Sequence, residues 1–341
     1  MLKLPGQQHM MESSNLVVFT SDDLKSFTET FHEKNLIGTT QFGRLFRGRI
    51  QPQGPDVTVK IWDEQSSCIS LVSDEYLMVK EEVKFLTHPT MNGHPNLVKL
   101  IGVCCEKEVR GVVYDLNPRD TLHNLIPKDD LNWIQRVNIM LQLASLIEYL
   151  HTQDKPYMIL NISGSHILLD WDCKPKLCDF GLISGGTMGE INTLKKQIPM
   201  PIGYADPFSA TRVGYRQTSS DVFSFGVILL GLISRRVLDL EKVNRPEFVI
   251  DSLVHCWARN EYRPNCSLAH KSLVEDWGYN SEDGTTITEI GIRCTEFFPK
   301  NRPTMKGVVE RLKSLLVFQR VGDTRPNKRE KKFLVDHAMI M

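Results

Sequence analysis

The stretch that decides the fold is PYMILNISGSHILLDWDCKPKLCDFG, residues 156–181. It contains two short apolar runs, 158–160 and 167–169, and the residues between these runs are mostly polar. A turn-forming sequence follows at 170–175 and leads to Asp179. Apolar runs this short, bounded by turn formers, are typical of small strands rather than helices. We therefore predict a loop followed by a hairpin, which presents polar side chains from a buried base.

This stretch resembles the catalytic and metal-binding loops of eukaryotic protein kinases, in which the motif HRDxxxxN precedes DFG. Residues 179–181 match DFG, which places the family's His-Arg-Asp on Ile159-Leu160-Asn161. The resemblance implies that Asp179 is the metal-binding aspartate. It also places Asn161 at the position of the catalytic Asp, Ser163 at that of the loop Lys, and His166 at that of the second metal-binding Asn.

The composition is that of an ordinary globular protein, with 41% hydrophobic and 24% charged residues among 341. The formal net charge is zero, so no overall field directs the chain to nucleic acid or to an anionic membrane. The eight cysteines lack the spacing of zinc ligands and are expected to be free thiols in a reducing cytosol. The longest apolar run, 227–233, is too short to span a bilayer, and no signal peptide or myristoylation glycine opens the sequence. We therefore predict a soluble intracellular protein.

A glycine-containing hairpin is predicted at residues 35–50, around Gly38 and Gly43. Two glycines five residues apart suit any hairpin, so the string alone identifies no function. Within the resemblance it takes the place of the glycine-rich loop GxGxxGxV, which covers the phosphates of ATP. Thr40 replaces the middle glycine, and its Cβ hinders close approach of the backbone to phosphates. Leu45 replaces the valine that lies over the adenine.

An alternating strand at 57–60 matches the family's VAIK element, and Lys60 takes the place of the phosphate-holding lysine. Thr58 replaces the small alanine of that element. A lysine on a strand is usually a solvated edge residue, so the assignment depends on a partner. The helix predicted at 74–86 supplies Glu82, which aligns with the glutamate that forms an ion pair with this lysine.

The nucleotide-binding slot implied by the resemblance is completed by Tyr114 and Leu168. Tyr114 takes the gatekeeper position, at the end of a strand that leads into the hinge between two lobes. Leu168 follows the catalytic loop. Residues 131–151 are predicted to form a helix whose apolar stripe belongs to the core. Residues 185–201, rich in glycine and proline, are predicted to belong to a flexible activation-type loop.

The string GYADPF at 203–208 resembles the family's GYxDPE, but Phe208 stands where the glutamate should be. The family pairs that glutamate with an arginine, here Arg302. An unpaired buried guanidinium would be costly, so we expect Arg302 to find another acceptor, such as Asp206. Phe208 is then expected to pack on the large lobe. Asp221 aligns with the aspartate that steadies the backbone of the catalytic loop.

The fold implied by the resemblance is α+β, the bilobal protein-kinase fold. We expect a small five-stranded N-lobe with one main helix at about 19–114, and a mostly helical C-lobe at about 115–318. Residues 1–18 are expected to be disordered, and residues 319–341 are expected to form a solvated basic tail.

Two further strings, NLVKLIGVC at 96–104 and WxxR at 133–136, look most like plant receptor-like cytoplasmic kinases. One function that this implies is an active ATP-dependent serine/threonine kinase, with Mg²⁺ held at Asp179. Against it, Asn161 is a neutral amide, and general-base catalysis typically contributes about 10²–10⁴ in rate. Mg²⁺ prefers oxygen ligands, so His166 is a poor replacement for the metal-binding Asn.

The function that we favour from the sequence is that of a pseudokinase, a scaffold or allosteric partner of receptor kinases or immune receptors in immune or developmental signalling. The residues that support folding persist, while those needed only for turnover are replaced. We expect weak or absent ATP binding, protein partners rather than nucleic acid, and a cytoplasmic location, at the plasma membrane only through partners. A third interpretation, an unrelated structural protein, requires all these ordered motifs to arise by chance.

Overall fold

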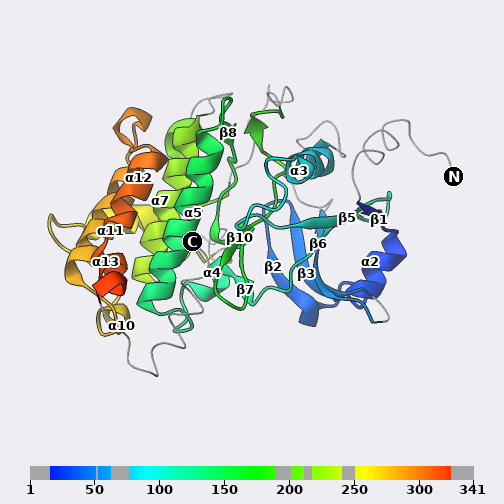
Figure 1. Cartoon of the computed structure of the whole chain (residues 1–341), viewed down its shortest axis with the longest axis horizontal. Coiled ribbons are helices and arrows are strands. Elements are labelled where there is room, and N and C mark those ends of the chain that lie inside the picture. Colours follow the sequence, from blue (N-terminus) through cyan, green and yellow to red (C-terminus); the bar gives the residue numbers. More distant parts are fainter. Residues whose placement is uncertain are drawn as a thin grey trace.

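The computed structural model describes residues 16–50, 53–62, 77–188, 201–210, 217–239 and 250–323. These residues form two lobes, a sheet-rich small lobe and a mostly helical large lobe (Figure 1). The arrangement confirms the expected α+β, bilobal protein-kinase fold.

A single sheet forms most of the small lobe. Its strands follow the spatial order β1-β5-β6-β4-β3-β2. Their bounds are β1 (Val17–Val18), β2 (Leu36–Thr39), β3 (Gly43–Arg49), β4 (Asp56–Trp62), β5 (Leu100–Cys105) and β6 (Arg110–Tyr114). Within the described part of the small lobe, the sheet is accompanied by α2 (Ser21–Phe27), η1 (Glu33–Asn35) and α3 (Leu77–Thr87).

The expected five-stranded sheet is corrected to six strands, because β1 adds to its edge. Val17 pairs in parallel with Gly102 of β5, and the N–H of Phe19 donates to the Val103 carbonyl at 2.9 Å. A Cβ on Gly102 would lie 2.2 Å from the Phe19 ring, so this glycine makes room for the added strand. Ordered structure therefore begins before residue 19, and residues 1–15 lie outside the described part of the chain.

The two faces of the sheet contact different parts of the molecule. On the outer face, α2 begins with a capping box between Thr20 and Asp23 and lies at the end of the small lobe away from the large lobe (Figure 1). It buries Leu24 and Phe27 in an outer cluster that is completed by Phe46, Val57, Val59, Ile61, Cys104 and Val113. On the inner face, alternate residues such as Leu45 join the main core that continues into the large lobe.

The large lobe is built around helices. Its helices are α4 (Leu122–Leu125), α5 (Trp133–His151), α6 (Pro207–Ala210), α7 (Thr218–Ser234), α9 (Val254–Glu261), α10 (Lys271–Val274), α11 (Ser281–Cys294), α12 (Met305–Lys313) and α13 (Leu316–Asp323). The short strands are β7 (Asp120–Thr121), β8 (Tyr157–Met158), β9 (Ile167–Leu169), β10 (Pro175–Leu177) and β11 (Ser184–Gly185). The 3-10 turns are η3 (Gly164–His166), η4 (Ile250–Ser252) and η5 (Pro299–Asn301).

Helices α5 and α7 form the centre of this lobe, with α11 and α12 packed against them (Figure 1). The predicted helix at 131–151 is confirmed as α5, which starts with a capping box between Asn132 and Gln135. Helix α13 extends past residue 318, where the domain was expected to end, and residues 324–341 lie outside the described part. The cysteines that the structure describes are free thiols, as expected.

Among the residues that the structure describes, no helix is both long enough and apolar enough to cross a bilayer.

Candidate functional site

The predicted loop and hairpin form as expected, where the two lobes meet. Strands β9 and β10 pair antiparallel, with Leu169 opposite Pro175. The turn between them is closed by Asp170, whose Oδ1 accepts a hydrogen bond from the backbone N–H of Lys174 at 2.8 Å. The polar residues that precede β9 lie in η3 and in the loop before it.

Asp221 of α7 fixes the backbone of this loop. Its carboxylate accepts hydrogen bonds from the N–H groups of Ile159 at 2.9 Å and Leu160 at 2.8 Å. Leu160 has a φ of +68°, a left-handed conformation that non-glycine residues seldom adopt. Because both hydrogen bonds stabilise this conformation, the expected role of Asp221 is confirmed.

Lys60, Glu82 and Asp179 meet in one buried cluster, although they come from β4, α3 and the loop after β10. The Lys60 Nζ lies 2.6 Å from Glu82 Oε2 and 2.7 Å from Asp179 Oδ1. The Tyr114 hydroxyl donates to the other oxygen of Glu82. All four residues are fully buried. The sequence-based pairing of Lys60 with Glu82 is therefore confirmed as a contact.

Lys60 and Asp179 stabilise each other's charge, whereas burial, with Asp179 nearby, raises the pKa of Glu82. Burial disfavours the charged form of Lys60, but Asp179 and Glu82 outweigh that effect and raise its pKa. Burial would likewise raise the pKa of Asp179, but Lys60 and His166 hold that pKa well below its ordinary value. The Asp179 carboxylate is therefore ionised and already paired with side chains of the protein.

Asn161, at the position of the catalytic Asp, faces the backbone of Asp179. Its Nδ2 donates a hydrogen bond to the Asp179 carbonyl at 2.9 Å. It is 1% exposed, and within the described residues its Oδ1 has no hydrogen-bond partner. An amide has no basic form at neutral pH, so this side chain positions the loop but does not accept a proton.

Ser163 and His166 lie against the second oxygen of Asp179. The Ser163 Oγ is 2.6 Å from His166 Nδ1, and His166 Nε2 is 3.4 Å from Asp179 Oδ2. Both residues are buried. With Lys60 on Oδ1 and His166 beside Oδ2, neither carboxylate oxygen of Asp179 faces solvent. A set of one paired carboxylate and one imidazole fits Mg²⁺ poorly, because that ion requires oxygen ligands in near-octahedral geometry.

The residues expected around the adenine lie in the interior of the protein, and their role toward a nucleotide stays a prediction. Leu45, Thr58 and Leu168 are all fully buried. The hydroxyl of Thr58 donates to the carbonyl of Leu116 in the hinge at 2.8 Å. A hinge carbonyl is one of the groups that an adenine could use, and here one of its two acceptor positions is taken by the protein itself.

The glycine-containing hairpin forms as predicted, but a tight turn closes it. Both the N–H and the hydroxyl of Thr40 donate to the Gly43 carbonyl, at 2.8 and 3.2 Å. A Cβ on Gly43 would lie 1.9 Å from the Ile61 carbonyl oxygen, so the sheet itself requires this glycine. A Cβ on Gly38 would lie 2.9 Å from the Thr121 methyl group of the large lobe. Packing therefore accounts for Gly43, whereas a side chain at Gly38 would require Thr121 to shift.

Two aromatic residues that the sequence analysis missed lie on the same inner side. Phe42, at the tip of the hairpin, is fully buried in the main core. The Lys60 Nζ lies 3.8 Å from the centroid of the Trp62 ring, a close cation–π contact. Alternation along β4 places Trp62 on the face of Lys60, which was the signal that could have identified it.

Phe180 and α3 complete the interior beside the charged cluster. The Phe180 ring packs on Phe85 of α3 at 4.6 Å between centroids, and Ile159 is buried in the same core. This contact couples the position of α3, which carries Glu82, to the loop that carries Asp179. The activation-type loop is described only as far as residue 188 and again from 201, so residues 189–200 lie outside the described part.

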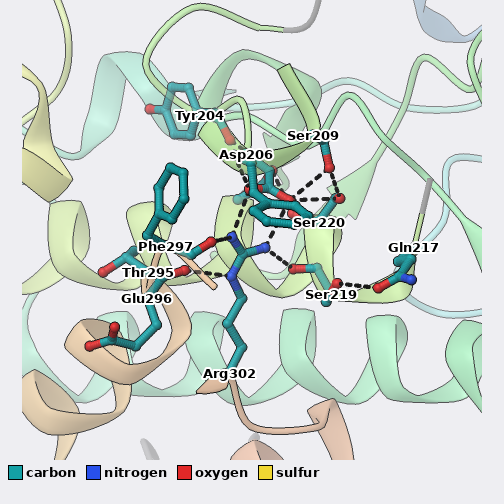
Figure 2. A network of polar contacts seen from close by, with 12 residues as sticks. Tyr204, Asp206, Ser209, Gln217, Ser219, Ser220, Thr295, Glu296, Phe297 and Arg302 are labelled. Atoms are coloured by element: carbon teal, nitrogen blue, oxygen red, sulfur yellow. Dashed lines mark hydrogen bonds and ion pairs between the residues drawn. The ribbon is translucent and has the colours of Figure 1, made fainter. Parts of the chain in front are cut away.

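Arg302 pairs with Asp206, the acceptor that was expected for it. Its two terminal nitrogens lie 2.6 and 2.8 Å from the two carboxylate oxygens of Asp206 (Figure 2). The hydroxyl groups of Ser209 and Ser220 donate to the same carboxylate at 2.8 and 2.9 Å. The guanidinium also donates to the backbone carbonyls of Ser219, Glu296 and Phe297. The pair is fully buried and fully hydrogen-bonded.

Phe208 packs on the large lobe, as expected. Its ring lies 5.8 Å from that of Phe297 and 6.4 Å from that of Phe298, both in edge-to-face geometry. Because Asp206 has taken over the ion pair, position 208 no longer needs a carboxylate.

Comparison with known proteins places this geometry in a family. A family model described as protein tyrosine and serine/threonine kinase matches residues 31–312. The serine/threonine-protein kinase BIK1 of Arabidopsis thaliana is 31% identical over 322 residues, which cover 90% of this chain and 78% of that protein. The probable serine/threonine-protein kinase PBL12 of Arabidopsis thaliana is 33% identical over 340 residues, covering 96% and 76% respectively.

A third relative carries the group name itself. The EPD1-interacting receptor-like cytoplasmic serine/threonine-protein kinase 5A of Gossypium barbadense is 35% identical over 320 residues, which cover 91% of this chain and 66% of that protein. The matches extend across both lobes and every motif discussed above. The chain therefore belongs to the protein tyrosine and serine/threonine kinase family, among relatives named as plant receptor-like cytoplasmic kinases.

Proposed function

We propose that this protein is a pseudokinase, a kinase domain without phosphotransfer activity that serves as a scaffold or allosteric partner in a plant receptor-kinase pathway. The observation that carries the proposal is the set of contacts that the oxygen atoms of Asp179 make with other side chains. Its two carboxylate oxygens face Lys60 and His166, and its backbone carbonyl accepts from Asn161. The three groups that would hold metal, phosphate and substrate proton in an active kinase are thus engaged with one another.

The folding interactions of the family support the same proposal, because they persist where catalytic groups do not. Asp221 still fixes the loop backbone, and the Lys60–Glu82 pair still links β4 to α3. The buried ion pair of Arg302 persists with a new partner. A kinase domain that acts only as a scaffold must still fold, so it needs these contacts. It does not need a general base.

The alternative function is an active serine/threonine kinase with an altered catalytic loop. Two observations favour it: the relatives are named as kinases, and the Lys60–Glu82 pair is intact. It requires another group to replace Asn161 as the base, and it requires His166 and Lys60 to move away from Asp179 when a metal and phosphates arrive.

Phosphotransfer separates the two functions. We expect highly purified protein to incorporate no more radiolabelled phosphate into a generic acceptor than Lys60→Met and Asp179→Asn controls, with the folding of each variant checked by circular dichroism. Asn161→Asp alone should stay near this level, because catalytic groups that act as a unit are non-additive. Activity is expected, if at all, only when Ser163→Lys, His166→Asn and Thr40→Gly are added. A robust wild-type signal that Lys60→Met abolishes would establish the active kinase instead.

Nucleotide binding is expected to be weak or absent, although the family generally uses ATP and Mg²⁺. Thr58 takes one of the two acceptor positions of a hinge carbonyl, and Lys60 is paired with two carboxylates. With a dissociation constant above about 1 mM, 1 mM ATP stabilises by less than about 0.4 kcal/mol, which shifts the Tm by under about 2 °C. Differential scanning fluorimetry with and without Mg²⁺ measures this shift.

The matched variant for this measurement is Thr58→Ala, which restores the family's alanine and removes the hydroxyl from the Leu116 carbonyl. It should increase the ATP-dependent shift relative to wild type. Sub-micromolar affinity of the wild type by calorimetry would show that the substitutions are accommodated, and the expectation would then be wrong.

The proposed partners are other signalling proteins, receptor kinases or immune receptors, and the proposed location is the cytoplasm, at the plasma membrane through those partners. One relative is named as EPD1-interacting, which supports a role defined by a protein partner. Isolation of the complexes from native tissue, followed by mass spectrometry, tests this. Recovery of nucleic-acid-binding machinery in place of receptor kinases or immune receptors would contradict it.

A further inference from the structure

We infer that the lobes of this kinase fold are held closed by the protein's own side chains, at the places where a kinase uses nucleotide and metal. The inference goes beyond the proposed function, because it concerns the resting conformation and not catalysis. Two contacts between the lobes carry it, one at the deep end of the region between them and one at the front.

The deep contact joins three elements through Asp179. Lys60 and Glu82 come from the small lobe, whereas Asp179 and His166 come from the large lobe. Lys60 bridges the lobes at 2.7 Å, and His166 Nε2 lies 3.4 Å from the other oxygen of Asp179. Ser163 fixes the orientation of the His166 ring through its Nδ1 atom. The side chains from α3 to η3 therefore lie in sequence, although the step from Asp179 Oδ2 to His166 Nε2 is a close approach and not a hydrogen bond.

The front contact joins β2 to the start of α4. The side-chain Nδ2 of Asn124 donates to the Ile37 carbonyl at 3.1 Å. The same nitrogen donates to Asp120 Oδ1 at 2.7 Å, which orients the amide. Beside this contact, a Cβ on Gly38 would lie 2.9 Å from the methyl group of Thr121, so an added side chain would require a shift there. The strand that opens the glycine-containing hairpin is therefore held against the large lobe.

Side chains of the small lobe also donate hydrogen bonds to the hinge and so help to hold the lobes closed. The guanidinium of Arg47, on β3, donates to the Asn117 side chain at 3.2 Å and to the backbone carbonyls of Pro118 and Arg119. Thr58 donates to the Leu116 carbonyl. A hinge bonded in this way has few free groups with which to absorb an opening motion.

The contacts together reproduce the requirements for the active arrangement of a kinase. That arrangement needs the ion pair between the strand lysine and the helix glutamate, with the DFG aspartate in place. Here Lys60 meets both carboxylates, and Phe180 packs under α3 on Phe85. A ligand shifts an equilibrium only by its differential affinity for the two states, so contacts among the protein's own side chains that already stabilise the closed state leave nucleotide little closure to add.

Hydrogen exchange with mass spectrometry tests the inference on the full chain, with 5 mM ATP and Mg²⁺ as the probe. We expect exchange in residues 36–46 and 159–166 of the wild type to be unchanged by ATP and Mg²⁺. Asn124→Ala should speed exchange in 36–46 by about two- to tenfold, the ratio that corresponds to the loss of one net hydrogen bond. His166→Asn should do the same in 159–166.

The matched control is Asn260→Ala, the same substitution at an exposed position on α9, which should leave both segments unchanged. Exchange in α7 and α11 reports global unfolding and should stay constant in all variants. A several-fold protection of the wild type by ATP and Mg²⁺, or an Asn124→Ala variant that exchanges like the control, would overturn the inference. Because the readout is independent of phosphotransfer, failure here and failure of the pseudokinase proposal are distinguishable.

Discussion

Replacing Asp206 by alanine is expected to lower the free energy of unfolding by about 3–5 kcal/mol, the cost of removing one partner from a buried ion pair. The side chains of Asp206 and Arg302 are both fully buried, and the guanidinium donates to both carboxylate oxygens. Without the carboxylate, an uncompensated charge remains in the large lobe. The hydroxyl groups of Ser209 and Ser220 also lose their acceptor. Urea denaturation of the wild type and the variant measures the difference.

Phe208→Glu is the control for this prediction, since it restores the family's residue two positions away. Arg302 already has its acceptors, so a second carboxylate should not stabilise the protein. A gain of more than about 2 kcal/mol, the upper range for hydrogen bonds to charged groups, would show that the lobe lacks an ion pair after all. A loss of less than about 1 kcal/mol in Asp206→Ala would contradict the prediction itself.

The pH dependence of stability gives an independent measure of the same pair. Burial would raise the pKa of Asp206, but Arg302 outweighs it, and the pKa is lowered in the folded state. A lowered folded pKa contributes stability that is present above the unfolded value of about 3.9 and is lost as pH falls through the folded value. The difference between wild type and Asp206→Ala should therefore narrow below about pH 4.

The features that could be predicted from the sequence are those in which the chemistry of one residue limits its possible partners. A buried guanidinium must have an acceptor, so the loss of the glutamate at 208 predicted a contact such as that of Arg302 with Asp206. Ordered family motifs predicted that Lys60 and Glu82 would meet, although 22 positions separate them in the chain. In each case, the chemistry of one residue required a particular type of partner.

Features that depend on packing between distant segments were not predictable in this way. Strand β1 has only two residues, and it forms because Gly102, far along the chain, leaves space for Phe19. Nothing in the sequence distinguishes Asn124 from other residues of a short helix. Its side chain nevertheless donates a hydrogen bond to the Ile37 carbonyl of the other lobe. Motif alignment likewise identified His166 as a substitution, but not the 3.4 Å approach of its ring to Asp179. Those contacts arise only when both lobes are in place.

Lys60→Met is expected to destabilise the protein by about 3–5 kcal/mol, because it leaves two carboxylates adjacent and buried without a counter-charge. In an open, hydrated cleft the same lysine would form a solvent-screened pair worth about 1 kcal/mol or less. The burial of Lys60, Glu82 and Asp179 therefore makes a stability measurement decisive. Adding Glu82→Gln and Asp179→Asn to Lys60→Met should recover much of the loss, since the remaining groups are neutral.

A double-mutant cycle isolates the Lys60–Asp179 interaction, and this chain supplies a matched exposed pair for comparison. Lys99 and Asp115 lie 2.8 Å apart, nearly the same separation, but their side chains are 61% and 44% exposed. We expect a coupling energy above about 2 kcal/mol for the buried pair, within the range for interacting residues, and below about 1 kcal/mol for the exposed pair. The buried coupling should also persist at 1 M salt, where the Debye length is about 3 Å, because screening acts mainly on exposed charges. Equal coupling of the two pairs would mean that water reaches Lys60, and the closed arrangement inferred here would then not be the state of the protein in solution.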